Sequence, residues 1–307
     1  MRRTTHKTIA SILFALLPLF MAPLTSLHAR AAAQDTEAMD APEAPPAGRV
    51  EYAYGGDPLQ KLDFWHATGS KPAALIVFVH GGGWKRGDKN NATGMTKVDH
   101  FLHEGYAVAS INYRLVPAAT VEQQAADVVA AVAWARTNAA RLGVDTSRVV
   151  LMGHSAGAHL VALVGTAPQY LSAAGLAMSD IRGVIALDGA SYEVPRQIAE
   201  AGRFMRATYV GAFGTDLARQ KALSPIFQAA APNVAAFLIL HVDRADGKTQ
   251  SEALAAALVK AGTAAEVRGF DGTGLRGHME INRSLGSADY PATAVVDTWL
   301  RTLLRQQ

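Results

Sequence analysis

The stretch VVLMGHSAGAHLVALV, residues 149–164, contains two hydrophobic patterns that meet at a glycine-rich centre. Val149 to Met152 form a short apolar run, as found in strands that are buried on both faces. Ala156 to Val164 have the composition of a buried helix. Between them, residues 153–157 (Gly-His-Ser-Ala-Gly) fit the pattern G-x-S-x-G. The stretch therefore predicts a strand, a very tight turn and a helix, with Ser155 at the turn.

The same alternation of strand-like and helix-like segments extends over the chain from Val50 onward. The predicted strands are Ala74–Val79, Ala107–Ile111, Val149–Met152, Val184–Leu187, Phe237–His241 and Ala265–Phe270, and the predicted helices are Met95–His103, Val121–Leu142, Ala156–Val164, Thr249–Ala261 and Ala292–Leu304. Val50–Tyr54 and Lys61–Trp65 are expected to form an antiparallel pair at the leading edge. Apolar strands separated by helices indicate a three-layer α/β/α fold with a mostly parallel central sheet.

The N-terminal residues have the layout of a secretory signal peptide. Basic residues in the first seven positions precede an apolar run from Ile9 to Leu24, and small residues follow from Ala29 to Ala33. The run contains prolines and is short for a bilayer span, which favours a cleaved signal over a retained membrane anchor. We therefore predict a signal peptide at 1–33, a disordered leader at 34–48 and one catalytic domain at 49–307, exported to the periplasm or secreted.

Composition excludes several classes of function. The chain has 29 Lys and Arg against 26 Asp and Glu, and four of the basic residues lie within 1–33. The mature chain would thus be almost neutral, which argues against nucleic acid or anionic lipid as the main partner. The absence of cysteine excludes disulfides, thiolate metal sites and a cysteine nucleophile. We expect a small-molecule substrate and no cofactor or metal, and the sequence makes no prediction of oligomeric state.

Ser155 is the candidate nucleophile. A serine on so tight a turn takes a strained backbone conformation, and Gly153 and Gly157 keep the strand and the helix from clashing. The turn exposes the hydroxyl at a helix N-terminus, where the N–H of Ala156 is unpaired and can donate to a developing oxyanion. An ordinary glycine-serine turn is the alternative, and the strand before and helix after the motif disfavour it.

A second glycine-rich segment, His80-Gly81-Gly82-Gly83-Trp84, also follows a predicted strand. Ligands bind beyond the carboxyl ends of such strands, so both segments are expected at one rim. Backbone N–H groups approach an oxyanion closely where no side chain intervenes, which makes Gly82 and Gly83 the predicted donors. Trp84 is a further candidate donor and a candidate substrate contact. A flexible loop and a phosphate cradle are alternatives, but no Lys-Ser or Lys-Thr pair follows as in a P-loop.

A serine nucleophile needs a histidine base that is held by a carboxylate. In folds with this serine turn the chain order is serine, acid, histidine, which leaves His159, His241 and His278. We predict His278, because it follows the glycine-rich stretch Gly272–Gly277 beyond the last strand and can reach back over the rim. His159 would follow its helix into the fold, and His241 ends a strand.

The acid is expected in the loop after the strand Phe237–His241. That loop offers Asp243 and Asp246, and we prefer Asp246 because Asp246-Gly247 is typical of a turn just before a helix. Asp188, which follows an earlier strand, is the third alternative. Each aspartate could instead be a surface-loop or N-cap residue.

Together these motifs resemble those of bacterial α/β-hydrolase carboxylesterases, in the branch with feruloyl-esterase-like and hormone-sensitive-lipase-like enzymes. The resemblance spans about Val50 to Leu304 and is carried by HGGGW at 80–84, NYRL at 112–115, GHSAGAHL at 153–160, Ser-Pro-Ile at 224–226 and HMEIN at 278–282. It implies Ser155 as nucleophile, His278 as base, and Gly82, Gly83 and Ala156 around the oxyanion. Relatives usually have His-Gly-x-x-Asp where this chain has HVDRAD at 241–246, so the acid departs from the family pattern.

The resemblance implies hydrolysis of carboxylic esters through an acyl-enzyme intermediate. Kynurenine formamidases share similar motifs, so an aryl-formamide hydrolase is the alternative, and a non-catalytic binding module on a hydrolase scaffold is another. We predict a small helical lid at 191–232, between two strands. Its large apolar residues could line a substrate pocket or form the apolar face of a lid helix: Tyr192, Phe204, Met205, Tyr209 and Phe213.

Overall fold

The computed structural model describes residues 48–69, 72–230 and 232–305. The predicted signal peptide, and the leader except for Gly48, lie outside these residues. Among the described helices, none has the length and apolar composition needed to span a membrane.

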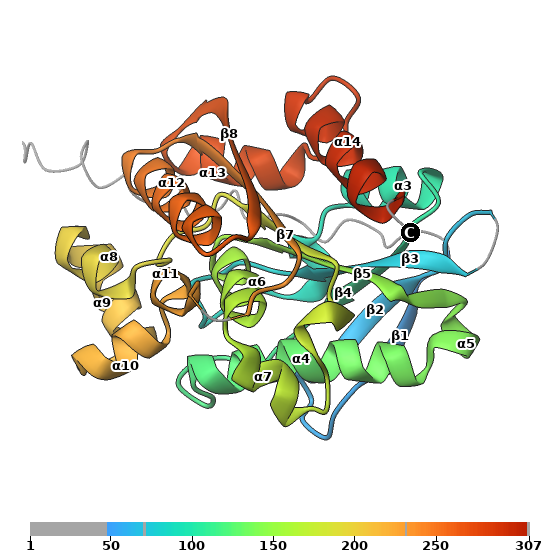
Figure 1. Ribbon diagram of the computed structural model, residues 1–307, viewed down its shortest axis with the longest axis horizontal. Helices are drawn as coiled ribbons and strands as arrows, with labels where there is room; N and C mark the ends of the chain where they lie inside the picture. The colour runs from blue at the N-terminus through green and yellow to red at the C-terminus, as the bar shows by residue number, and fades with distance from the viewer. Residues whose placement is uncertain (1–47, 70–71, 231, 306–307) are drawn as a thin grey trace, which may run out of the picture. The chain divides into compact units, whose positions relative to one another are not determined.

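An eight-stranded sheet forms the centre of the fold, in the order β1-β2-β4-β3-β5-β6-β7-β8 (Figure 1). The strands are β1 Val50–Ala53, β2 Lys61–Trp65, β3 Ala73–Val79, β4 Ala107–Ile111, β5 Val144–His154, β6 Gly183–Leu187, β7 Ala236–Asp243 and β8 Ala264–Thr273. β2 pairs antiparallel with both β1 and β4, and all other neighbours are parallel. The predicted mostly parallel sheet with an antiparallel leading edge is therefore confirmed.

Helices cover both faces of the sheet. They are α2 Lys89–Ala92, α3 Met95–His103, α4 Val121–Thr137, α5 Ala139–Leu142, α6 Ala156–Thr166, α7 Pro168–Ala173, α8 Val194–Glu200, α9 Arg203–Phe213, α10 Leu217–Ala222, α11 Pro225–Gln228, α12 Ala245–Lys260, α13 Gly274–Arg283 and α14 Pro291–Arg305. The alternation of side chains along β3 decides which core each enters. Leu75 and Val77 face the core shared with α4, α6 and α12, whereas Ile76 and Phe78 face α3, α13 and α14.

Most boundaries lie within three residues of the predicted ones, and the predicted helix Val121–Leu142 is divided into α4 and α5 at Asn138. Two elements begin well before their predicted starts. β5 begins at Val144, five residues before the predicted strand, and α12 begins at Ala245, four residues before the predicted helix. The earlier start of α12 matters for the acid, because it places Asp246 inside the first turn of the helix. An acidic residue there is favoured by the helix dipole, which the turn interpretation of Asp246-Gly247 overlooked.

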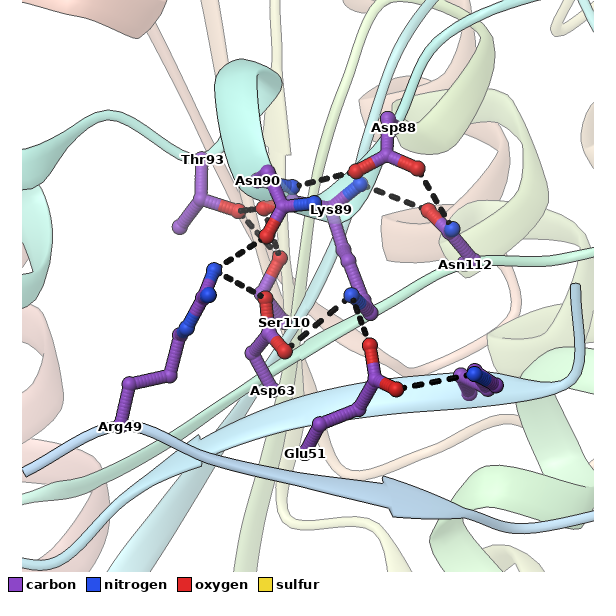
Figure 2. A network of polar contacts seen from close by, with 10 residues as sticks. Arg49, Glu51, Asp63, Asp88, Lys89, Asn90, Thr93, Ser110 and Asn112 are labelled. Carbon is purple, nitrogen blue, oxygen red and sulfur yellow. Dashed lines mark hydrogen bonds and ion pairs between the residues drawn. The ribbon is translucent and has the colours of Figure 1, made fainter. Parts of the chain in front are cut away.

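A polar network fastens the leading edge of the sheet to the segment that follows the second glycine-rich loop (Figure 2). The ammonium group of Lys89 lies 2.9 Å from Glu51 and 3.1 Å from Asp63, and Arg49 lies 3.3 Å from Asp63. The side chains of Lys89 and Asp63 are almost fully buried, so each charge is compensated by the other.

The segment 191–232 folds into the four short helices α8 to α11. Of its predicted lid or pocket residues, Tyr192, Tyr209 and Phe213 are buried in the core, whereas Phe204 and Met205 are exposed. The three buried side chains thus form the apolar face of the insertion. His159 Nε2–H donates to the carbonyl oxygen of Leu223 at 2.8 Å and so attaches the insertion to α6.

Candidate active site

Ser155 occupies a strained turn between β5 and α6. Its φ of 56° and ψ of −118° lie outside the right-handed helical and extended regions. A Cβ on Gly153 would approach the carbonyl oxygen of Gly157 to 2.3 Å, and a Cβ on Gly157 would approach the carbonyl oxygen of Val79 to 2.1 Å. Only glycine fits at these two positions, so the sequence forces the turn that presents Ser155.

Backbone strain gathers around this serine. Among the described residues, four non-glycine residues have positive φ, namely Trp84, Ser155, Asp188 and Ser191. All four follow the carboxyl ends of β3, β5 and β6, which are neighbours in the sheet. Each such residue costs about 1–3 kcal/mol, and such strain typically clusters at functional sites. The rim at these strand ends is therefore the candidate active site.

The predicted oxyanion loop lies against Ser155. A Cβ on Gly81 would lie 3.0 Å from Cβ of Ser155, and Gly82 and Gly83 have φ of 124° and 61°. Within the described part of the chain, the backbone N–H groups of Gly82, Gly83 and Ala156 donate no hydrogen bond. These are free donors beside a serine hydroxyl, as an oxyanion site requires.

The loop is held at its ends by the NYRL motif. The hydroxyl of Tyr113 donates to the carbonyl oxygen of His80 at 2.9 Å, and the two rings stack with centroids 4.4 Å apart. At the other end, the side chain of Asn112 accepts from the N–H of Lys89 at 2.6 Å and donates to Asp88 at 2.8 Å. The loop geometry is thus preorganised by residues that do not reach Ser155.

Trp84 does not lie open to substrate as predicted. Its side chain is 3% exposed, its indole N–H donates to Nδ1 of His159 at 3.3 Å, and its ring packs edge-on against Phe213 with centroids 4.7 Å apart. The prediction rested only on the position of Trp84 directly after the glycines in the sequence, and it did not include the packing of the insertion. Because the insertion folds over this indole, Trp84 anchors α9 to the oxyanion loop. Burial also lowers the pKa of its partner His159 to about 4, so that imidazole is neutral.

His278 pairs with Asp188. Nδ1–H of His278, on α13, donates to Oδ2 of Asp188 at 2.5 Å, and the backbone N–H of Val242 donates to Oδ1 at 3.1 Å. Burial by itself would raise the pKa of Asp188. The hydrogen bond from His278 and the charge of Arg244 outweigh burial and leave that pKa below its ordinary value. The pair is therefore an ionised carboxylate that accepts a hydrogen bond from the Nδ1 edge of an imidazole.

The predicted acid, Asp246, is not the partner of His278. Its carboxylate accepts from the amide of Gln197 at 3.1 Å and lies 3.4 Å from Nε of Arg244. Asp243, the second choice, is the exposed last residue of β7. The prediction failed because the family pattern led to the loop after β7, whereas the carboxylate comes from the end of β6. The signal was present in Asp188-Gly189, directly after the strand beside the serine strand.

His154 connects the serine turn to the histidine. Its Nε2–H donates to the carbonyl oxygen of His278 at 2.8 Å, and the two rings lie 4.5 Å apart. Burial, with the neighbouring His278, lowers the pKa of His154 well below its ordinary value, so this imidazole is neutral. Because His154 directly precedes Ser155, these contacts bring Ser155 and His278 to the same rim.

The other predicted base candidate, His241, is buried at the end of β7, where its Nδ1–H donates to the carbonyl oxygen of Val242 at 3.0 Å. Among the described residues, no group of three or more His, Asp and Glu side chains is arranged to hold a metal ion.

Known proteins share both the fold and parts of the sequence. Esterase LipC of Mycobacterium tuberculosis is 37% identical over 127 residues, which cover 40% of this chain and 31% of LipC. Carboxylesterase NlhH of the same species is 32% identical over 127 residues, 40% of each protein. The match thus spans well under half of these curated relatives.

Solved structures cover more of the chain. Esterase B from Lactobacillus rhamnosis (HN001) superposes with a TM-score of 0.71 at 24% identity, over 90% of this chain and 91% of that one. Native esterase 2 of Thermogutta terrifontis superposes with a TM-score of 0.65 at 24% identity, over 84% and 93%. These likenesses establish the α/β-hydrolase fold. The BD-FAE family model matches residues 62–258, more than half of the chain, and the chain therefore belongs to the BD-FAE family of α/β-hydrolases.

Proposed function

We propose that this protein hydrolyses carboxylic esters, with Ser155 as the nucleophile. The observation that carries the proposal is the strained serine that shares one rim with the Asp188–His278 pair and the free amides of the oxyanion loop. The esterase and carboxylesterase names of the relatives support the same reaction class.

The mechanism follows from the roles that the geometry allows. Nε2 of His278 would accept the proton of Ser155 as the oxygen attacks the ester carbonyl, because Nδ1–H is held by Asp188 and leaves Nε2 as the basic nitrogen. The N–H groups of Gly82, Gly83 and Ala156 would bind the oxygen of the tetrahedral intermediate. The imidazolium then protonates the departing alcohol, and water hydrolyses the acyl-enzyme by the reverse steps.

Two variants separate the acid assignments. Asp188→Asn should lower kcat by about 10⁴-fold, because the amide favours the wrong tautomer of the imidazole. Asp246→Asn, the matched control in the first turn of α12, should leave kcat within the same order of magnitude as the wild type. Equal loss in both, or greater loss in the second, would refute Asp188 as the partner.

The substrate class is tested with a panel. p-Nitrophenyl esters of increasing acyl length, methyl ferulate and N-formylkynurenine are assayed with the wild type and with Ser155→Ala. We expect ester hydrolysis that is lost in Ser155→Ala while the circular dichroism spectrum is unchanged. A preference for N-formylkynurenine would favour the aryl-formamide hydrolase. Inertness with no labelling of Ser155 by a fluorophosphonate would favour the binding module.

We also propose that residues 1–33 direct export to the periplasm or beyond the cell. The basic start, apolar run and small residues support this proposal. Mass spectrometry of the mature N-terminus tests it. An uncleaved chain in the cytoplasmic fraction would contradict it.

A further inference from the structure

Arg244 occupies an unusual place beside the histidine–aspartate pair. It follows β7, and its guanidinium reaches back along the rim. Nε lies 3.5 Å from Oδ2 of Asp188 and 3.4 Å from Oδ1 of Asp246, and Nη1 lies 3.5 Å from Nδ1 of His278. One guanidinium thus contacts the carboxylate and the imidazole that pair with each other, together with a second carboxylate.

The stability of α12 does not explain this arginine. Arg244 is the N-cap residue of the helix and makes no side-chain cap hydrogen bond. Arginine is not among the favoured N-cap residues, and a cation at a helix N-terminus is disfavoured by the helix dipole. Asp246 in the first turn supplies the negative charge that this helix end prefers. The position of Arg244 therefore points to its contacts on the rim.

Those contacts are electrostatic more than they are directional. Nε and Nη2 of Arg244 are buried, and within the described residues neither donates a hydrogen bond to a protein atom. The side chain as a whole is 22% exposed, whereas that of Asp188 is fully buried. A buried carboxylate needs compensating charge. His278 must be neutral when it acts as a base, so in that state Arg244 is the cation beside Asp188.

We propose that Arg244 is a positioning residue that holds the Asp188 carboxylate ionised and aimed at Nδ1 of His278, while it draws the nearby Asp246 away from that imidazole. The inference deepens the proposed ester hydrolysis and rests on it for its kinetic consequence. Arg244 acts through Asp188 and needs no contact with substrate.

The test compares Arg244→Gln and Arg244→Lys with Arg276→Gln. Arg276 lies two residues before His278 on α13, is exposed, and makes no ion pair among the described residues, so its change removes the same charge near the site without touching Asp188. With p-nitrophenyl butyrate, Arg244→Gln should lower kcat about 10- to 100-fold, because catalytic groups lose their alignment, and should leave KM within about twofold. Arg244→Lys keeps the charge and should recover most of kcat, and Arg276→Gln should match the wild type.

A readout without substrate separates this inference from the proposed function. The proton on Nδ1 of His278 should give a far-downfield resonance in one-dimensional proton NMR, which Asp188→Asn abolishes and Asp246→Asn leaves in place. Arg244→Gln should shift or broaden that resonance. If the wild type proves inert toward esters but the resonance still responds to Arg244→Gln, the positioning role stands and the proposed function fails.

Three results would overturn the inference. These are an unchanged resonance and kcat in folded Arg244→Gln, an Arg244→Lys protein as slow as Arg244→Gln, and an equal loss in Arg276→Gln. Thermal unfolding of each variant identifies any protein that has lost its fold, and in that case the Arg244→Lys comparison decides.

Discussion

Lys97 provides a quantitative test of the core between the sheet and α3. Its side chain is about 2% exposed, and its ammonium group lies 4.7 Å from the ring centroid of Phe78. It donates to the carbonyl oxygens of Thr93 and Asn282 and to Oδ1 of Asn282, which are all neutral acceptors. Burial, with no carboxylate partner among the described residues, lowers the pKa of Lys97 from 10.5 to about 7.

This shift makes stability depend on pH. Between pH 7 and 10.5 the unfolded chain binds a proton at Lys97 that the folded chain does not bind, so the free energy of unfolding rises with pH in that window. A difference of one bound proton between the unfolded and folded chains changes the free energy of unfolding by at most about 1.4 kcal/mol per pH unit. In Lys97→Met this contribution is absent. From pH 7.5 to 9.5, the stability of the wild type minus that of Lys97→Met should therefore increase by about 2 kcal/mol.

The assay is urea unfolding of both proteins at pH 7.5, 8.5 and 9.5. The window ends below pH 10, because several buried tyrosines, Tyr113 among them, have raised pKa values and lower the free energy of unfolding of both proteins at higher pH. Lys260→Met, at the exposed end of α12, is the control, and its free energy of unfolding should change with pH in the same way as that of the wild type. If the difference in free energy of unfolding between the wild type and Lys97→Met is the same at all three pH values, the lowered pKa of Lys97 is refuted.

Three further substitutions test separate parts of the structure. Gly157→Ala should destabilise the protein by about 3 kcal/mol or more, seen as a lower Tm, because its Cβ would lie 2.1 Å from a carbonyl oxygen of β3. Phe204 is 79% exposed and lies on α9, the helix over the oxyanion loop. Phe204→Ala should leave Tm unchanged but lower kcat/KM for long acyl esters roughly tenfold relative to short ones. The exposed control Val259→Ala should change neither Tm nor kcat/KM. Lys89→Met should cost about 3–5 kcal/mol in urea unfolding, because the buried carboxylate of Asp63 loses the nearer and more deeply buried of its two cations. Unchanged stability in the first or third variant, or equal loss for all acyl lengths in the second, would contradict the corresponding contact.

The parts of the site that depend on the local backbone could be predicted from sequence. The Ser155 turn follows from two glycines at fixed spacing, between a strand and a helix that the hydrophobic pattern already indicated. The oxyanion loop follows in the same way from its glycines at the end of a strand. For Gly153 and Gly82 the steric constraint comes from a residue four positions away, so contiguous sequence encodes it, whereas the constraint on Gly157 comes from Val79 of β3.

The carboxylate that pairs with His278 depends on tertiary geometry and was not predicted as the first choice. Asp188 directly follows β6, Asp243 ends β7 and Asp246 begins α12, all at the same rim, so a position near the end of a strand does not by itself distinguish them. The position that α13 gives to His278 brings its Nδ1 to Asp188, and we propose that Arg244 holds that carboxylate in place. The burial of Trp84 was missed for a similar reason, because it depends on how α9 packs over the loop.

The order of the strands has a consequence for how such a site can change. β3, β5, β6 and β7 are consecutive in the sheet, and the segments at their carboxyl ends carry in turn the glycine-rich loop 80–84, Ser155, Asp188 and Arg244. Neighbouring tips are only about 4.8 Å apart, so side chains on adjacent ones reach the same imidazole. A carboxylate at the end of β6 and one at the end of β7 can therefore both lie within reach of the same histidine, with the strand order unchanged.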